Sequence, residues 1–306
     1  MLPIIIYCGV NRMEKHINNN EVSDLMVTEE VREKLKGKQL YLLKEFLNIC
    51  RNNNLQYFLV GGSALGAVRH KGYIPWDDDI DVALPRHDYN KFIEIAQTQL
   101  GSSIFLQTFL TDKEYRNDFA KLRLEGTAFI ESSCRNLNIH HGIYMDIFPI
   151  DGYPDKKSDI KRMNFIKRVV KTYVGKDYCS YNNSPIIKKI CRKCWLFVCS
   201  VLCGFQHTSN VLNHLDKLYQ RWDYNSCYEV VCHGGAWGEL EHCPKVQYGN
   251  GTSAQFEGID VLIPELFDEY LEHKYPNYMQ LPPPEKRVSH HYCDVIDVDN
   301  SYRKYR

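Results

Sequence analysis

The sequence predicts an α+β fold: a mixed β-sheet with flanking helices, followed by a mainly helical second half. Two observations lead to this prediction. Between residues 29 and 152, apolar residues at helical spacing alternate with the short apolar runs that are typical of strands. Between residues 156 and 222 the chain is basic, and its apolar residues recur mostly at helical spacing.

The expected elements follow from this apolar periodicity and from the residues that interrupt it. Helical spacing predicts helices over residues 29–50, 64–69, 87–99, 185–204 and 265–273. Short apolar runs between turn residues predict strands over residues 56–60, 79–84, 105–109, 119–124 and 143–148.

The expected organisation has four parts along the chain. Residues 1–28 contain an Asn18–Asn20 run and are expected to be disordered. Residues 29–152 are expected to form the core with the mixed sheet, residues 153–292 a helical and mixed C-terminal part of the same domain, and residues 293–306 a tail.

The composition limits the classes of partner and compartment. The 306 residues contain 38 basic and 38 acidic side chains, so no net charge draws the chain to nucleic acid, and we expect no nucleic-acid partner. The 12 cysteines are scattered along a chain long enough to bury a core, and residues 1–10 lack the basic start of a secretory signal. We therefore expect reduced thiols and a cytoplasmic location.

Gly61, Gly62 and Ser63 follow a predicted strand and precede a short helix. The first turn of a helix exposes backbone N–H groups and a positive dipole end, which together accommodate a phosphate, and glycine lets the ligand approach the main chain. Ser63 can cap the helix or contact the phosphate. The alternative is a tight turn in which Ser63 is only a helix cap.

Asp79 and Asp81 are two residues apart in the next predicted strand, where alternate side chains share a face. Two neighbouring carboxylates repel each other unless a cation lies between them, and Mg²⁺ prefers oxygen ligands. The alternative is a solvated acidic turn. A calcium-binding EF-hand loop is excluded because Val82 stands where that loop needs glycine and Pro85 interrupts it.

Asp146 is the one acid in the apolar run 143–148. A buried carboxylate without a partner is costly, so Asp146 requires one. A metal ion shared with Asp79 and Asp81 would supply it. The alternative is a hydrogen-bonded aspartate of the core.

The segment from Gly62 to Asp81 resembles the signature of the LicD family, which belongs to the same superfamily as fukutin and fukutin-related protein. Shorter pieces resemble the family at residues 121–123, 141–151, 256–258 and 278–287. The resemblance spans residues 55–292, although residues 156–250 match only loosely. It implies a nucleotidyltransferase-like fold with a glycine-rich turn, an acid–x–acid strand and a third acid on a neighbouring strand.

The resemblance also implies an activity. LicD-like enzymes transfer phosphocholine or a similar phospho-alcohol from a CDP-linked donor to a hydroxyl of a cell-surface glycan, such as lipopolysaccharide, capsule or teichoic acid, and release CMP. Asp79, Asp81 and Asp146 would hold Mg²⁺ or Mn²⁺, and Asp146 would accept the hydroxyl proton. The alternatives are a nucleotidyltransferase that releases pyrophosphate and a non-catalytic glycan-binding or scaffold protein.

Four basic side chains are candidates for binding the donor's diphosphate. Arg69 and Lys71 lie between the glycine turn and the acidic strand. Lys121 and Arg123 share one face of a predicted strand because they are two residues apart. The alternative for this second pair is a solvent-exposed basic pair.

Residues 188–205 begin with basic residues and end with apolar ones. This order suits peripheral contact with the inner face of a membrane, where a lipid-linked glycan acceptor would lie. The alternative is a helix of the core.

Two cysteine clusters are possible zinc sites. However, one helix cannot wrap four ligands around an ion, and the alternative is that these cysteines are thiols of the core. The members of the two clusters are Cys191, Cys194, Cys199 and Cys203, and Cys232, His233, His242 and Cys243.

Overall fold

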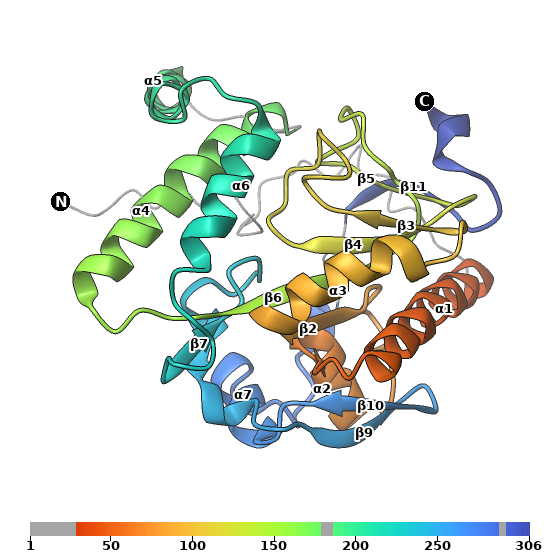
Figure 1. Cartoon of the computed structure of the whole chain (residues 1–306). Helices are drawn as coiled ribbons and strands as arrows, with labels where there is room; N and C mark the ends of the chain where they lie inside the picture. Colours follow the sequence, from red (N-terminus) through yellow and green to blue (C-terminus); the bar gives the residue numbers. More distant parts are fainter. Residues whose placement is uncertain (1–28, 179–185, 288–291) are drawn as a thin grey trace.

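The computed structural model describes residues 29–178, 186–287 and 292–306, and it confirms the α+β class (Figure 1). The expected disorder of residues 1–28 lies outside the described residues. The helices are α1 (Glu29–Asn52), α2 (Gly61–Arg69), α3 (Arg86–Gln99), α4 (Lys157–Val174), α5 (Ile186–Leu202), α6 (Thr208–Tyr219) and α7 (Phe267–Lys274). Within the described ranges, none of the helices has the length and the apolar content that crossing a lipid bilayer requires.

The strands form one mixed sheet and two small antiparallel pairs. They are β1 (Phe58–Leu59), β2 (Asp81–Pro85), β3 (Ile104–Gln107), β4 (Ala120–Leu124), β5 (Ala128–Glu131), β6 (Tyr144–Gly152), β7 (Glu229–Val231), β8 (His242–Pro244), β9 (Thr252–Phe256), β10 (Ile259–Ile263) and β11 (Cys293–Asp297). The main sheet has the order β1-β2-β6-β4-β3, with β7 beside β6 and β8 beside β7. Only the β2–β6 pair is parallel in this sheet.

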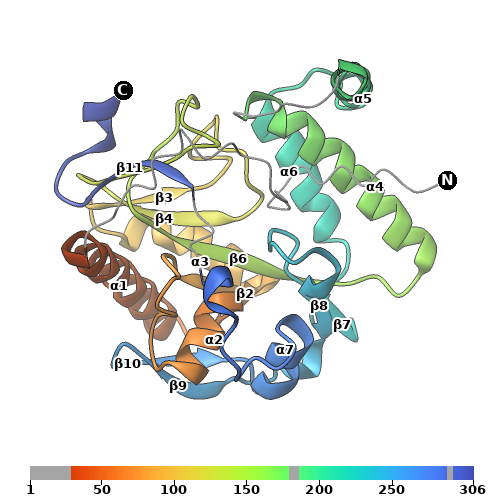
Figure 2. The same cartoon turned by 180° about the vertical axis from the view of Figure 1, so that it is seen from behind.

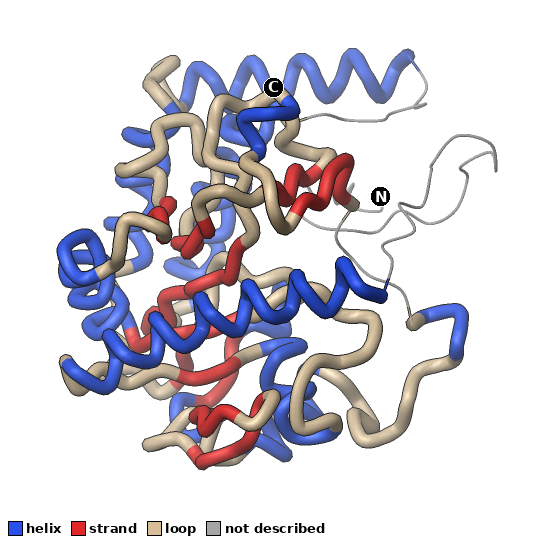
Figure 3. Tube along the Cα trace, turned by 90° about the vertical axis from the view of Figure 1, so that its right-hand side faces the viewer, coloured by secondary structure: helices blue, strands red, loops and turns tan. Residues whose placement is uncertain are grey.

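Helices α1 and α3 pack on the main sheet, and α1 runs across it in the side view (Figure 3). The main apolar core lies between these two helices and the sheet. Strand β6 is covered on both faces, since all nine of its residues are buried. Ile80, Val82, Met145 and Ile147 are completely buried, as their alternation with the acids predicted.

A second apolar core holds the helical part of the chain together. Met163, Val170 and Tyr173 of α4 pack with Leu212 and Leu215 of α6. Figure 2 shows α4 and α6 side by side at one end of the molecule, with α5 outside them. This arrangement confirms that the chain is mainly helical between residues 157 and 219.

Two expectations about strands were wrong. The strand expected at residues 79–84 begins at Asp81, so Asp79 lies in the preceding loop. Strands β5 and β7 to β11 were not expected. One of these strands, β11, lies in residues 293–306: Cys293–Asp297 pairs with β5, and Tyr302 is buried. These strands have only three to five residues each, so each carries little periodic signal of its own; β5 and β11 also pair across a long stretch of sequence, whereas β9 and β10 form a hairpin.

Candidate active site

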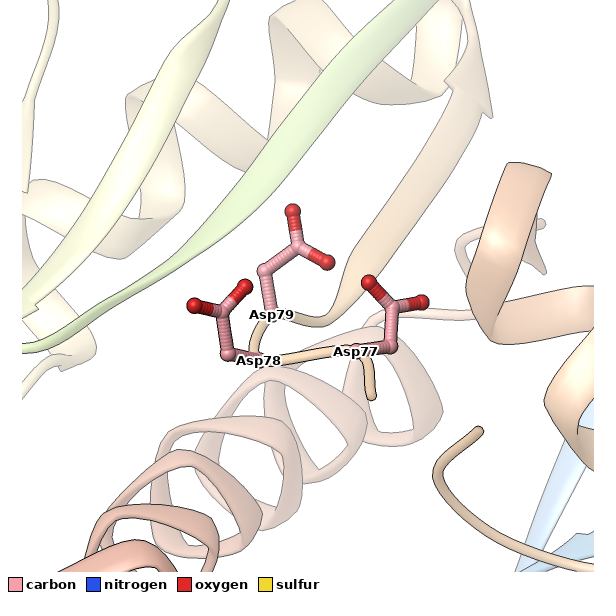
Figure 4. Close-up of side chains that lie close together, drawn as sticks. All are labelled: Asp77, Asp78 and Asp79. Atoms are coloured by element: carbon pink, nitrogen blue, oxygen red, sulfur yellow. The ribbon is translucent and has the colours of Figure 1, made fainter. Parts of the chain in front are cut away.

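The loop before β2 carries three consecutive carboxylates, those of Asp77, Asp78 and Asp79. All three residues are half-buried, and one oxygen from each lies within 4.8 Å of the others (Figure 4). In the described part of the chain, no other set of three or more acidic, histidine or cysteine side chains is grouped this closely. Asp79 therefore meets Asp77 and Asp78 in a loop, rather than sharing a strand face with Asp81.

The start of α2 lies directly against these acids. A β-carbon at Gly62 would be 2.5 Å from Asp77 Oδ2, and one at Gly61 would be 3.5 Å from Asp81 Oδ2. Gly61 also has a φ of +55°, which disfavours other residues. The two glycines thus let carboxylates approach the positive end of the helix, where negative charge is stabilised.

Ser63 does not have the expected role of a helix cap. Its hydroxyl accepts a hydrogen bond of 2.9 Å from the backbone N–H of Asp81, and it does not cap α2. Ser63 is buried, with 2% of its surface exposed. This bond ties the first residue of β2 to the first turn of α2 and so holds Asp81 beside the glycines.

Asp81 and Asp146 are directly opposite each other in the parallel β2–β6 ladder. Neighbouring residues in register point to the same face of a sheet, so both carboxylates belong to one side. The N–H of Asp146 also donates a 2.9 Å hydrogen bond to the carbonyl of Ile80. The sheet therefore brings together two acids that are 65 positions apart in the sequence.

The buried Asp146 has a protein partner, Lys121 of β4. The Lys121 ammonium lies 2.9 Å from Oδ1 and 3.2 Å from Oδ2 of Asp146, and 3.5 Å from the ring centre of Tyr144. Burial raises the pKa of Asp146, Lys121 lowers it and the charge of Asp79 raises it again, so that the net pKa is above the usual value. The effect of Asp79 places the acidic loop within electrostatic reach of Asp146.

Arg123 is fully buried, so a solvent-exposed Lys121–Arg123 pair is the wrong description. Arg123 donates hydrogen bonds to Gln107 Oε1 at 2.8 Å and to the carbonyl of Gly142 at 2.9 Å. Its guanidinium also lies over the ring of Tyr144, 4.5 Å from the centre. These contacts give Arg123 a structural role in joining β3, β4 and β6.

Arg69 and Lys71 have different surroundings. Arg69 Nη1 donates to the carbonyls of Tyr278 at 2.5 Å and Gln280 at 3.3 Å, and thereby holds the C-terminal segment against α2. Lys71 is exposed, with a φ of +60°. Of the two, Lys71 is the side chain that solvent reaches freely.

Two aromatic residues of the C-terminal half complete the site and were missed by sequence reasoning. The Tyr270 hydroxyl accepts a 3.2 Å hydrogen bond from the N–H of Gly61. The Tyr275 hydroxyl would lie 3.8 Å from a β-carbon at Gly61, and burial, with Glu241, Asp81 and Asp77, raises its pKa well above the usual value. Tyr270 lies on α7 and Tyr275 directly follows it, and their positions in the sequence give no sign of this contact, because α7 meets α2 only in the folded chain.

The cysteine clusters do not form a comparable group of ligands in the described residues. Cys191 and Cys194 are exposed, whereas Cys199 and Cys203 are buried. The ten described cysteines are free thiols.

Comparison with known sequences identifies relatives along most of the chain. Residues 54–177 match the family described as "LicD/FKTN/FKRP, nucleotidyltransferase domain". The "Lipopolysaccharide cholinephosphotransferase LicD" of Haemophilus influenzae is 27% identical over 259 residues, which cover 82% of this chain and 92% of the relative. Human "Ribitol 5-phosphate transferase FKRP" is 33% identical over 69 residues, covering 22% of this chain and 14% of the relative. An uncharacterized Rickettsia typhi protein is 37% identical over 111 residues, or 34% of this chain and 36% of the relative.

Proposed function

Because the chain belongs to the LicD family, we propose that it transfers a phospho-alcohol group, phosphocholine or a similar one, from a CDP-linked donor to a hydroxyl of a cell-surface glycan. The acceptor is a free or lipid-linked glycan, and CMP is released. The relative named as a lipopolysaccharide cholinephosphotransferase aligns over nearly its whole length, which supports this class of reaction. The observation that carries the proposal is the placement of the acidic loop and Asp81 against the start of α2, with Asp146 opposite Asp81 in the β2–β6 ladder.

The acidic residues fit Mg²⁺ or Mn²⁺. Carboxylate oxygens are the ligands these ions prefer, and those of the acidic loop lie within 4.8 Å of one another. In addition, Asp146 is opposite Asp81 in the β2–β6 ladder, so its carboxylate lies on the same side of the sheet, 2.9 Å from the Lys121 ammonium. We propose Asp79, Asp81 and Asp146 as ligands, with Asp77 as a neighbouring carboxylate. In the described residues these three acids do not form a group within 4.8 Å as Asp77, Asp78 and Asp79 do, so the ion would have to draw them together. When bound, the ion would neutralise charge on the donor's diphosphate.

The chain's own residues then perform the proton transfer. The acceptor hydroxyl loses its proton to Asp146, and its oxygen forms a bond to the phosphorus that carries the alcohol. The bond from that phosphorus to the bridging oxygen breaks, and the electron pair leaves with CMP. Lys121 holds the Asp146 carboxylate in place for this transfer.

The basic residues divide between binding and structure. We assign Lys71 to the donor's diphosphate because it is exposed and lies next to the acidic loop in the sequence. The contacts of Arg69 and Arg123 with main-chain carbonyls support structural roles for both. The first turn of α2 faces two carboxylates, so the N–H groups of Gly61 to Ser63 would bind a phosphate only together with a cation.

A product assay tests this function against its alternatives. The full chain is incubated with Mg²⁺, a glycan acceptor and either CDP-choline, CDP-ribitol or CTP, and the nucleotide products are separated by chromatography. We expect CMP from a CDP-alcohol and no pyrophosphate from CTP. Pyrophosphate from CTP would favour the nucleotidyltransferase, and the absence of both products across a panel of CDP-alcohols would favour a binding protein.

A further inference from the structure

Helix α5 presents its apolar side to solvent. Ile187 is 75% exposed, Phe197 is 64% exposed and Val201 is 51% exposed. We refer to the exposed residues of this side as the α5 apolar face: Ile187, Ile190, Phe197, Val198, Val201 and Leu202. The interpretation of this segment as a helix of the core is therefore wrong. A surface helix normally turns its apolar stripe inward, so this outward face needs a partner.

A different side of α5 already packs on the protein. Cys199 is completely buried there, and Trp195 Nε1 donates a 3.3 Å hydrogen bond to Thr172 Oγ1 of α4. Cys203, which follows the helix, is buried on the same side. Because these residues anchor α5, the apolar face cannot turn inward without losing them. Figures 1 and 2 show α5 at the edge of the molecule, outside α4 and α6.

The charges of α5 are all positive. Lys188, Lys189, Arg192 and Lys193 lie in its first half, and its 17 residues include no aspartate or glutamate. A partner of this helix must therefore offer an apolar layer next to negative charge. The surface of a bilayer with anionic lipids has that combination, because acyl chains lie directly beneath its headgroups.

We propose that α5 binds an anionic lipid surface, with the α5 apolar face inserted at the boundary between headgroups and acyl chains and the lysines at the headgroups. A second copy of the chain fits less well, because α5 has no acid with which to pair the four basic residues across a symmetric contact. This inference stands apart from the transfer reaction. It would keep the enzyme on the surface where lipid-linked glycans are found.

Vesicle flotation tests the proposal with the full chain. We expect the protein to float with vesicles of equimolar phosphatidylglycerol and phosphatidylcholine, and to stay in solution with phosphatidylcholine alone. Phe197→Ser with Val201→Ser should abolish flotation. Lys189→Gln and Lys193→Gln should each weaken the apparent partition roughly fivefold, since one basic residue near an anionic surface contributes that much.

Matched controls are Leu110→Ser and Lys44→Glu, which change an exposed apolar and an exposed basic residue elsewhere. Both should float like the original chain. Circular dichroism should show the same helix content in all variants, because the substituted side chains are exposed. The proposal is overturned by a failure to float, by flotation that survives the Phe197 and Val201 changes, or by a dimer in light scattering that those changes dissociate.

Discussion

Lys121 and Asp146 face each other across the antiparallel β4–β6 ladder, and their side chains form an ion pair of 2.9 Å. This pair lies on the side of the sheet that carries Asp81. A lone carboxylate buried this deeply would be costly, and Lys121 offsets part of that cost. The same contact sets the charge state of the residue to which we assign proton transfer.

We expect Lys121→Met to move the acid limb of the pH profile to higher pH. Burial holds the pKa of Asp146 above its usual value while Lys121 opposes this, so loss of the ammonium raises that pKa further. A base acts when deprotonated, and activity is therefore lost as the pH falls through its pKa. The measurement is kcat/KM for CMP release against pH. An unchanged acid limb would remove Asp146 as the base.

We expect Asp79→Asn and Asp81→Asn to abolish turnover and weaken Mn²⁺ binding in titration calorimetry, while circular dichroism stays unchanged. Removing one of several neighbouring charges relieves repulsion, so the fold should tolerate it. Glu94→Gln, on the exposed side of α3, is the control. Comparison with Asp77→Asn tests whether that neighbour is a ligand too. Full activity of the Asp79 or Asp81 variant would contradict the metal assignment.

Gly62→Ala should damage the site and spare the fold. Its β-carbon would lie 2.5 Å from Asp77 Oδ2, so that side chain must move while the backbone stays in place. We expect kcat/KM to fall roughly 10- to 100-fold, as when support of a metal site is disturbed. Gly37→Ala is the control: its new β-carbon meets nothing within 4 Å, and it should raise the stability of α1 by up to about 1 kcal/mol. Equal activity of the two variants would refute this account of Gly62.

Arg123→Met should destabilise the protein by about 3–5 kcal/mol in urea unfolding, because it leaves the buried partners of the guanidinium unsatisfied. Arg135→Met is the matched control. Its ion pair with Asp294 is exposed, with half of the Arg135 side chain accessible, and such pairs contribute under about 1 kcal/mol. An Arg123 variant of normal stability but with a raised KM for the donor would instead indicate substrate binding.

Asp118 should make stability depend on pH in the acid range. Burial raises its pKa, but the 2.7 Å ion pair with Lys171 outweighs burial and lowers the pKa to about 2. An unfolded aspartate has a pKa of about 3.9, so the stabilisation is complete above that pH and is lost as the pH falls toward 2. The difference in unfolding free energy between the original chain and Asp118→Asn should shrink over that window by on the order of 2 kcal/mol. A constant difference would contradict this.

Periodicity predicted the longer elements, whose apolar spacing repeats over many residues. Helices α1 and α3 lie within two residues of the expected ranges, because apolar spacing along a helix records directly which side is buried. The same alternation placed Ile80 and Ile147 in the core. Strand β11 was not predicted. Its partner, β5, lies about 160 positions away in the sequence and supplies the hydrogen bonds that define β11 as a strand.

Some features of the candidate site could likewise be predicted from the sequence, and others appear only in the tertiary structure. The sequence by itself determined that acids, glycines and bases concentrate between residues 61 and 81, and that Asp146 needs a partner. Tertiary structure alone decided that this partner includes Lys121 and that Tyr275 stands beside the acids. It also decided which side of α5 packs on the protein, since Trp195 and Cys199 meet α4 and leave Phe197 in solvent. Composition fixes what a segment can bury, whereas only the packing of neighbouring elements determines which of its faces is covered.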